Sequence, residues 1–109
     1  MLSNYFNFDK ASRIKDNFIS FDKPLKDQLD DLYEDMFYSI YEDISITLDI
    51  GWYGSTKNLK GVFILYLIKE DDWDNPILKL STKDLSILRH YIKSSVEFID
   101  NQLINSGSD

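Results

Sequence analysis

The sequence predicts an α+β domain in which a three-stranded antiparallel meander packs with two main helices, in the order α-β-β-β-α. Three observations support this fold class. Apolar residues recur every three or four positions in two long segments, one near each end of the chain. Between them, one stretch alternates apolar and polar residues and the next is continuously apolar, as in half-covered and fully covered strands. Glycine and proline punctuate the connections between these stretches.

The chain has 109 residues, the size of a single domain. We divide it into an N-terminal segment (1–21), the α-β-β-β-α body (22–104) and a frayed polar tail (105–109). There is no cysteine, so disulfides and thiolate metal ligands are excluded. Neither a signal-peptide pattern nor the roughly 20 apolar residues of a membrane span is present. We therefore expect a cytoplasmic protein that does not contact membranes.

The N-terminal segment fits two structures. Asp9 can cap an extra short helix whose inward residues would be Ala11, Ile14 and Phe18. An edge strand over residues 5–8 is the alternative, because three of these four side chains are aromatic. We favour the short helix.

The first main helix is predicted from Asp22 to about Ser39. Asp22 can cap free amides, and Pro24 is tolerated in a first turn. One apolar stripe follows the helical period and consists of Leu25, Leu29, Leu32, Met36 and Ile40. The opposite side stacks carboxylates on adjacent turns, namely Asp27, Asp30, Asp31, Glu34 and Asp35. Like charges at this spacing weaken a helix, so we expect this acidic side to have a function.

Three strands are predicted after this helix. Residues 42–52 alternate, with Ile44 to Trp52 on one face and a polar opposite face. A glycine-bounded connection, 54–61, leads to residues 62–68, which are apolar throughout and are expected to form the central strand. After the acidic turn 70–75, residues 77–80 are long enough for a third strand.

A second main helix is predicted to begin at a capping box formed by Ser81 and Asp84. Its apolar stripe consists of Leu85, Leu88, Ile92, Val96, Ile99 and Leu103. We expect this stripe to pack across the sheet.

The net charge is −7, from 12 basic and 19 acidic side chains. An acidic surface repels nucleic acid and accelerates encounter with cationic proteins, although it also simply keeps a protein soluble. We therefore expect no direct nucleic-acid binding.

Catalytic and metal sites are not predicted. His90 is the single histidine, and it lies away from the apolar stripe without a nucleophile motif. Asp71, Asp72, Asp74 and Asn75 could bind calcium or magnesium weakly, but they lack the spacing of an EF-hand loop, so a solvated turn is preferred. No cofactor is expected either, because the glycines form no phosphate-binding pattern.

The aromatic residues are candidates both for packing and for partner contact. Trp52 continues an inward strand face and is predicted to pack. For Trp73, packing over the sheet edge is preferred to a role as a partner anchor, whereas Tyr53 is the better exposed candidate. Three further tyrosines lie on or beside the acidic helix side and divide between packing and contact: Tyr33, Tyr38 and Tyr41.

Three segments, together with the closing amphipathic helix, resemble small bacterial immunity proteins of contact-dependent growth inhibition and related polymorphic toxin systems. These segments are Leu48-Asp-Ile-Gly-Trp-Tyr53, Gly61-Val-Phe-Ile-Leu-Tyr-Leu-Ile-Lys69 and Asp71-Asp-Trp-Asp-Asn-Pro76. The resemblance covers residues 43–104. It implies a cytoplasmic protein that binds one cognate toxin C-terminal domain, often a nuclease, and blocks its active site or its access to substrate. The matched elements are scaffold, so no contact residue is carried over.

The acidic residues supply a hypothesis for the partner site. A nuclease needs a cationic cleft, and an inhibitor can fill that cleft with carboxylates. We predict that the partner contacts Asp27, Asp31, Glu34, Asp35 and Tyr38, with a second patch at Asp71, Asp72 and Asp74. The protein would be a monomer or a weak homodimer, since two helices or a second copy could cover the central strand.

Two other functions remain open. One is an acidic DNA mimic or adaptor that binds a host protein. The other is an enzyme with paired carboxylates such as Asp31 and Asp35, one of whose pKa values would have to be raised by burial.

Overall fold

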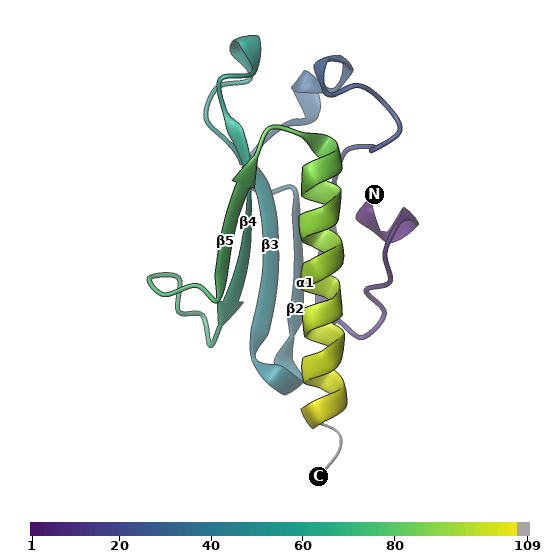
Figure 1. Ribbon diagram of the computed structural model, residues 1–109, viewed down its shortest axis with the longest axis vertical. Coiled ribbons are helices and arrows are strands. Elements are labelled where there is room, and N and C mark those ends of the chain that lie inside the picture. The colour runs from purple at the N-terminus through teal and green to yellow at the C-terminus, as the bar shows by residue number, and fades with distance from the viewer. Residues whose placement is uncertain (107–109) are drawn as a thin grey trace.

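The computed structural model describes residues 1–106 and has an α+β fold with a five-stranded antiparallel sheet and one long C-terminal helix (Figure 1). Every strand pairs with the next strand in the sequence, in the order β1-β2-β3-β4-β5. The strands are β1 (Arg13–Asp16), β2 (Phe37–Tyr41), β3 (Ile46–Tyr53), β4 (Val62–Lys69) and β5 (Leu78–Thr82), and the helix is α1 (Leu85–Ser106). Short 3-10 turns form η1 (Leu2–Asn4), η2 (Leu25–Asp27), η3 (Leu29–Asp31), η4 (Glu42–Ile44) and η5 (Lys57–Leu59).

The predicted three-strand meander is present as β3, β4 and β5. As expected, β4 lies between two neighbours and β5 follows the acidic turn. The first of these strands begins at Ile46 rather than at residue 42, because residues 42–44 form η4 and Ser45 has a left-handed backbone with φ of 54°. Ile44 therefore does not belong to the strand face on which it was placed.

The predicted first helix is wrong. Residues 22–39 contain η2, η3 and most of β2, and Pro24 has an extended backbone with ψ of 142° instead of opening a helix. Residues 37–41 are mainly aromatic and β-branched, which favours a strand, and β2 pairs with both β1 and β3. These long-range hydrogen bonds, together with repulsion among stacked carboxylates, outweigh the helical spacing of the leucines.

The N-terminal segment forms neither of the predicted structures. The short helix is wrong because residues 13–16 form the edge strand β1, and the alternative edge strand at 5–8 is not formed either. The Asp16 carboxylate accepts hydrogen bonds from the backbone N–H groups of Leu2 and Ser3, at 2.8 and 2.9 Å. Leu2 and Phe8 are buried, and the segment lies alongside α1 in Figure 1. The chain start thus completes the layer that covers the sheet.

Helix α1 has the predicted apolar stripe but a later start. Asp84 is its cap: one carboxylate oxygen accepts hydrogen bonds from the Ser86 and Ile87 backbone N–H groups and from the Ser86 hydroxyl. Ser81 instead belongs to β5. The stripe packs on the core, with Leu88, Ile92 and Ile99 buried. Of the expected frayed tail, residues 105–106 end the helix and residues 107–109 lie outside the described part of the chain.

The core lies between the sheet and the layer formed by α1 and the N-terminal segment. Phe18 contacts Phe63 of β4 with ring centroids 6.0 Å apart, and Phe8 contacts Phe37 of β2 at 4.8 Å. Trp52 is 1% exposed and meets Phe63 edge-to-face, which confirms that it packs. Within residues 1–106, no helix has the length and apolar character needed to cross a membrane.

Candidate functional site

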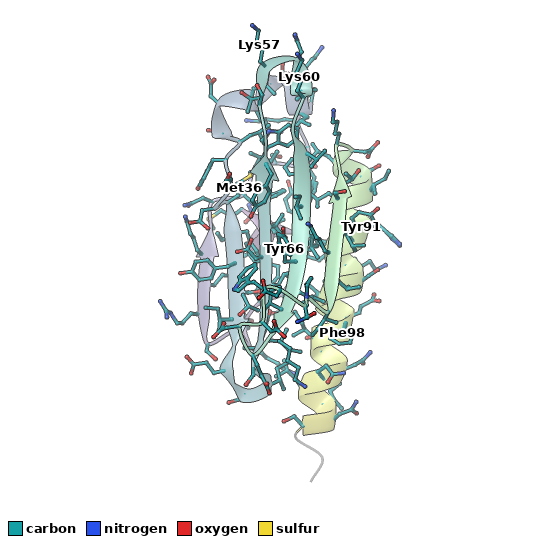
Figure 2. The ribbon with its side chains drawn as sticks, turned by 90° about the vertical axis from the view of Figure 1, so that its left-hand side faces the viewer. Met36, Lys57, Lys60, Tyr66, Tyr91 and Phe98 are labelled. Carbon is teal, nitrogen blue, oxygen red and sulfur yellow. The ribbon has the colours of Figure 1, made fainter. Side chains whose placement is uncertain are left out.

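One face of the sheet is not covered by α1 or by the N-terminal segment, and we call it the open face. Strand side chains alternate between the two faces of a sheet. Along β3 and β4, every second side chain packs in the core, and the side chains between them point to the open face. Figure 2 looks onto it, with Tyr66 near its centre. Its members are Arg13 and Lys15 on β1, Tyr38 and Ile40 on β2, Thr47, Asp49, Gly51 and Tyr53 on β3, Val62, Ile64, Tyr66 and Ile68 on β4, and Lys79 and Ser81 on β5.

A row of five side chains crosses the centre of the open face at right angles to the strands. The register pairs Lys15 with Tyr38, Tyr38 with Asp49, Asp49 with Tyr66, and Tyr66 with Lys79. Directly opposed residues on antiparallel strands have Cβ atoms about 5 Å apart. The row therefore places one carboxylate at the centre, a tyrosine on each side and a lysine at each end.

Aromatic rings extend from this row along the open face. Tyr66 meets Tyr53 edge-to-face at 6.4 Å and meets Trp73 at 5.5 Å. Ammonium groups of the same chain already lie over two rings, with Lys79 Nζ 5.7 Å from the Tyr66 ring centre and Lys15 Nζ 5.5 Å from that of Tyr33. The rings of this face thus attract cations.

Gly51 brings two of the predicted site residues to the open face. A Cβ atom at Gly51 would lie 1.7 Å from the backbone oxygen of Glu34, so only glycine permits the 33–36 segment to cross here. The Trp52 backbone N–H donates to the Tyr33 carbonyl at 2.8 Å and holds the crossing segment in place. As a result, the exposed carboxylates of Glu34 and Asp35 lie near β3.

The crossing segment concentrates negative charge around Asp49. Burial, reinforced by the charge of Asp35 and opposed by Lys15, raises the pKa of Asp49 from 3.8 to about 6. Burial and then the nearby Asp49, Tyr66, Glu34 and Asp35 raise the pKa of Tyr53 to about 12. Burial therefore disfavours the charge of Asp49 at the centre of the face, and Lys15 does not restore its ordinary pKa.

The second predicted acidic patch lies beside the same face. Asp71, Asp72 and Asp74 are exposed in the turn between β4 and β5, where the Asn75 amide donates to the Asp72 carboxylate at 3.3 Å. Trp73 of this turn contacts Tyr66, so the turn is joined to the centre of the open face. Ile68 is only 1% exposed although it points away from the main core.

The predicted site residues divide into two groups. Glu34, Asp35 and Tyr38 lie on or beside the open face, and the 70–76 turn adds the second patch. Asp27 and Asp31 are exposed in η2 and η3, and no helix stacks them with Glu34 and Asp35 as predicted. Asp31 instead borders an open depression of about 420 Å³ that is also lined by N-terminal residues such as Met1 and Asn17.

Asp49 and Tyr66 were missed as site residues. Asp49 stands on the polar side of an alternating strand, a signal that could have found it, but Tyr66 is hidden in an apolar run. Trp73 makes the predicted packing contact and yet remains 48% exposed, while Tyr53 is half-buried rather than exposed. Of the flanking tyrosines, Tyr41 is 3% exposed and belongs to the core, Tyr38 is half-buried and Tyr33 is 40% exposed.

Among residues 1–106, no group of three or more histidine, cysteine, aspartate or glutamate side chains is placed to hold a metal ion. His90 is exposed on α1, where it borders an open depression of about 550 Å³ together with Arg89 and Lys93.

Comparison with known protein families, characterised proteins and solved structures finds no match to this chain.

Proposed function

We propose that this protein is a cytoplasmic immunity protein that binds and neutralises the C-terminal domain of a cognate toxin. The partner is a cationic domain, most simply a nuclease, and the contact surface is the open face with the 70–76 turn. The observation that carries the proposal is the position of Asp49, which is half-buried between two tyrosines at the centre of the open face. Burial and the charge of Asp35 raise its pKa there, so holding its charge carries a cost. A cationic partner would offset that cost.

The chemistry of the open face supports binding more than turnover. Carboxylates attract the cationic cleft of a nuclease and raise the association rate, while rings such as Tyr66 and Trp73 bury area and slow dissociation. The protein would act as a competitor for the phosphates of the toxin's substrate, without a catalytic step or cofactor of its own.

Co-expression tests this function. The protein should rescue growth when it is produced with the toxic C-terminal region encoded by the neighbouring upstream gene, and the two should co-purify. The double variant Glu34→Lys/Asp35→Lys should lose rescue, whereas Glu97→Lys/Asp100→Lys changes the same charge on exposed positions of α1 and should retain it. Equal affinity of both variants for the toxin at low salt would refute the assignment of the open face.

The acidic DNA mimic or adaptor is the main alternative, because it would use the same charged face. Genome context separates the two, since an immunity gene should adjoin a gene for a large secreted protein with a toxic C-terminal region.

A carboxylate enzyme gains one supporting observation, which is the raised pKa of Asp49. Asp49 is not one of the two acids, Asp31 and Asp35, that the sequence suggested for an enzyme. Activity with an apparent pKa near 6 that is lost in Asp49→Asn would favour the enzyme.

A further inference from the structure

We propose that Asp49 docks an arginine side chain of the protein partner, whose guanidinium lies over the carboxylate between the rings of Tyr38 and Tyr66. This inference rests on the proposed function and adds the chemical identity of the group bound at the centre of the open face.

The first step is the shape of the centre. Tyr38 and Tyr66 are the direct cross-strand neighbours of Asp49, one on each side. Along β3, the next side chains on the same face are Thr47 and Tyr53. Because the Asp49 side chain is shorter than the phenol side chains on either side, a flat cation can lie above it with its faces against the rings, and we call this position the slot.

The second step is the charge that surrounds Asp49 from each neighbouring element. The 33–36 segment contributes Asp35, whose charge raises the pKa of Asp49, and Glu34, whose charge acts on the neighbouring Tyr53. The turn after β4 carries further carboxylates on either side of Trp73, which contacts Tyr66. β1 contributes Arg13 and Lys15, and β5 contributes Lys79. Arg13 lies opposite Ile40 in the row next to Asp49, and the ammonium groups of Lys15 and Lys79 lie over the rings of Tyr33 and Tyr66 at 5.5 and 5.7 Å. Within residues 1–106, burial and the charge of Asp35 raise the pKa of Asp49, and the charge of Lys15 lowers it. Lys15 therefore offsets only part of the penalty on the charge of Asp49, which leaves the slot open to a further cation.

The third step is the choice of cation. A guanidinium can stack on tyrosine faces and donate two parallel hydrogen bonds to one carboxylate, whereas an ammonium is a compact, strongly hydrated point charge. Arg89 of the same chain makes a contact of this kind, since its guanidinium carbon lies 5.0 Å from the Tyr5 ring centre and 5.4 Å from that of Phe21. The net charge of −7 favours an approaching cationic surface. An arginine of the partner therefore matches the slot better than a lysine.

The test uses only this protein and short peptides, so its outcome is independent of whether a toxin exists. The isotope-labelled protein is titrated with acetyl-Gly-Arg-Gly-amide and, separately, with the corresponding lysine and citrulline peptides. Binding is measured from the NMR shifts of the backbone amides. We expect saturable shifts at Tyr38, Asp49 and Tyr66 with the arginine peptide, binding at least about threefold weaker with lysine, and none with citrulline.

Two variants complete the test. Asp49→Asn should abolish the saturable shifts, and it is expected to fold because it removes a destabilising charge. Asp43→Asn makes the same chemical change at an exposed position in η4 and should leave binding unchanged. Equal binding of the lysine peptide, shifts centred on the 70–76 turn, or persistence of binding in Asp49→Asn would overturn the arginine slot. Failure of toxin rescue with an intact arginine titration would reject the proposed function alone.

Discussion

Replacing Asp49 with asparagine is expected to stabilise the isolated protein at neutral pH. The pKa of Asp49 is raised from 3.8 to about 6, a difference of about 2 units. At 1.36 kcal/mol for each unit, the charged carboxylate would cost at most about 3 kcal/mol of the free energy of unfolding. Asp49 is only half-buried, so solvent screening reduces the expected gain to about 1–2 kcal/mol.

The sign of the pH dependence follows from which state holds the proton. Below the ordinary pKa of 3.8, Asp49 is protonated in both the folded and the unfolded protein, and its charge costs nothing. Between 3.8 and about 6, the folded protein keeps a proton that the unfolded chain has released, so the stability of the natural sequence falls as pH rises. The advantage of Asp49→Asn should therefore grow across this window and be complete at pH 7.

Urea unfolding of the natural protein and of Asp49→Asn, repeated from acid to neutral pH, measures this difference. Asp43→Asn is the matched control, since it removes an exposed carboxylate and should track the natural protein. A variant that is no more stable than the natural protein at pH 7, or whose advantage does not change with pH, would refute the argument that Asp49 is held at a cost.

Three further outcomes follow from particular contacts. Gly51→Ala should lower the free energy of unfolding by more than about 2 kcal/mol, because the added Cβ would meet the Glu34 carbonyl oxygen; a melting temperature like that of the natural protein would contradict this. Asp84→Ala should destabilise the fold at pH 7. The Ser86 hydroxyl and the Ile87 amide lower the pKa of Asp84, so this loss should vanish only as acid protonates the folded carboxylate; a loss that persists unchanged in strong acid would count against the cap. Ultraviolet titration should show a tyrosine that ionises only near pH 12 and is absent in Tyr53→Phe, and an unchanged titration of that variant would reject the buried phenol.

Local patterns in the sequence were sufficient for the C-terminal two thirds of the fold. The alternation in β3, the apolar run in β4 and the stripe in α1 each reflect burial of one or both faces of a single element. Composition likewise established an acidic domain without thiols, and the acids Glu34 and Asp35 were recognised as unusual.

The N-terminal 41 residues depended on long-range pairing. Leu25, Leu29 and Leu32 recur with a helical period, yet the first two lie in 3-10 turns and Leu32 follows with an extended backbone. Their side chains reach the core from these loops. β1 and β2 form because each finds hydrogen-bond partners on the other although they are distant in the sequence, as in Arg13 opposite Ile40 and Asp16 opposite Phe37. Local propensity does not indicate which strands will pair.

The periodicity of the sequence also could not predict which residues come together in the candidate site. Asp49 has Tyr38 and Tyr66 as neighbours only because of the strand register, since a shift by one residue would send those side chains to the opposite face. Glu34 and Asp35 join them because Gly51 leaves room for a backbone to cross β3. Sequence patterns describe which side of an element is buried, whereas the neighbours that give Asp49 its charge environment are set by how separate elements align.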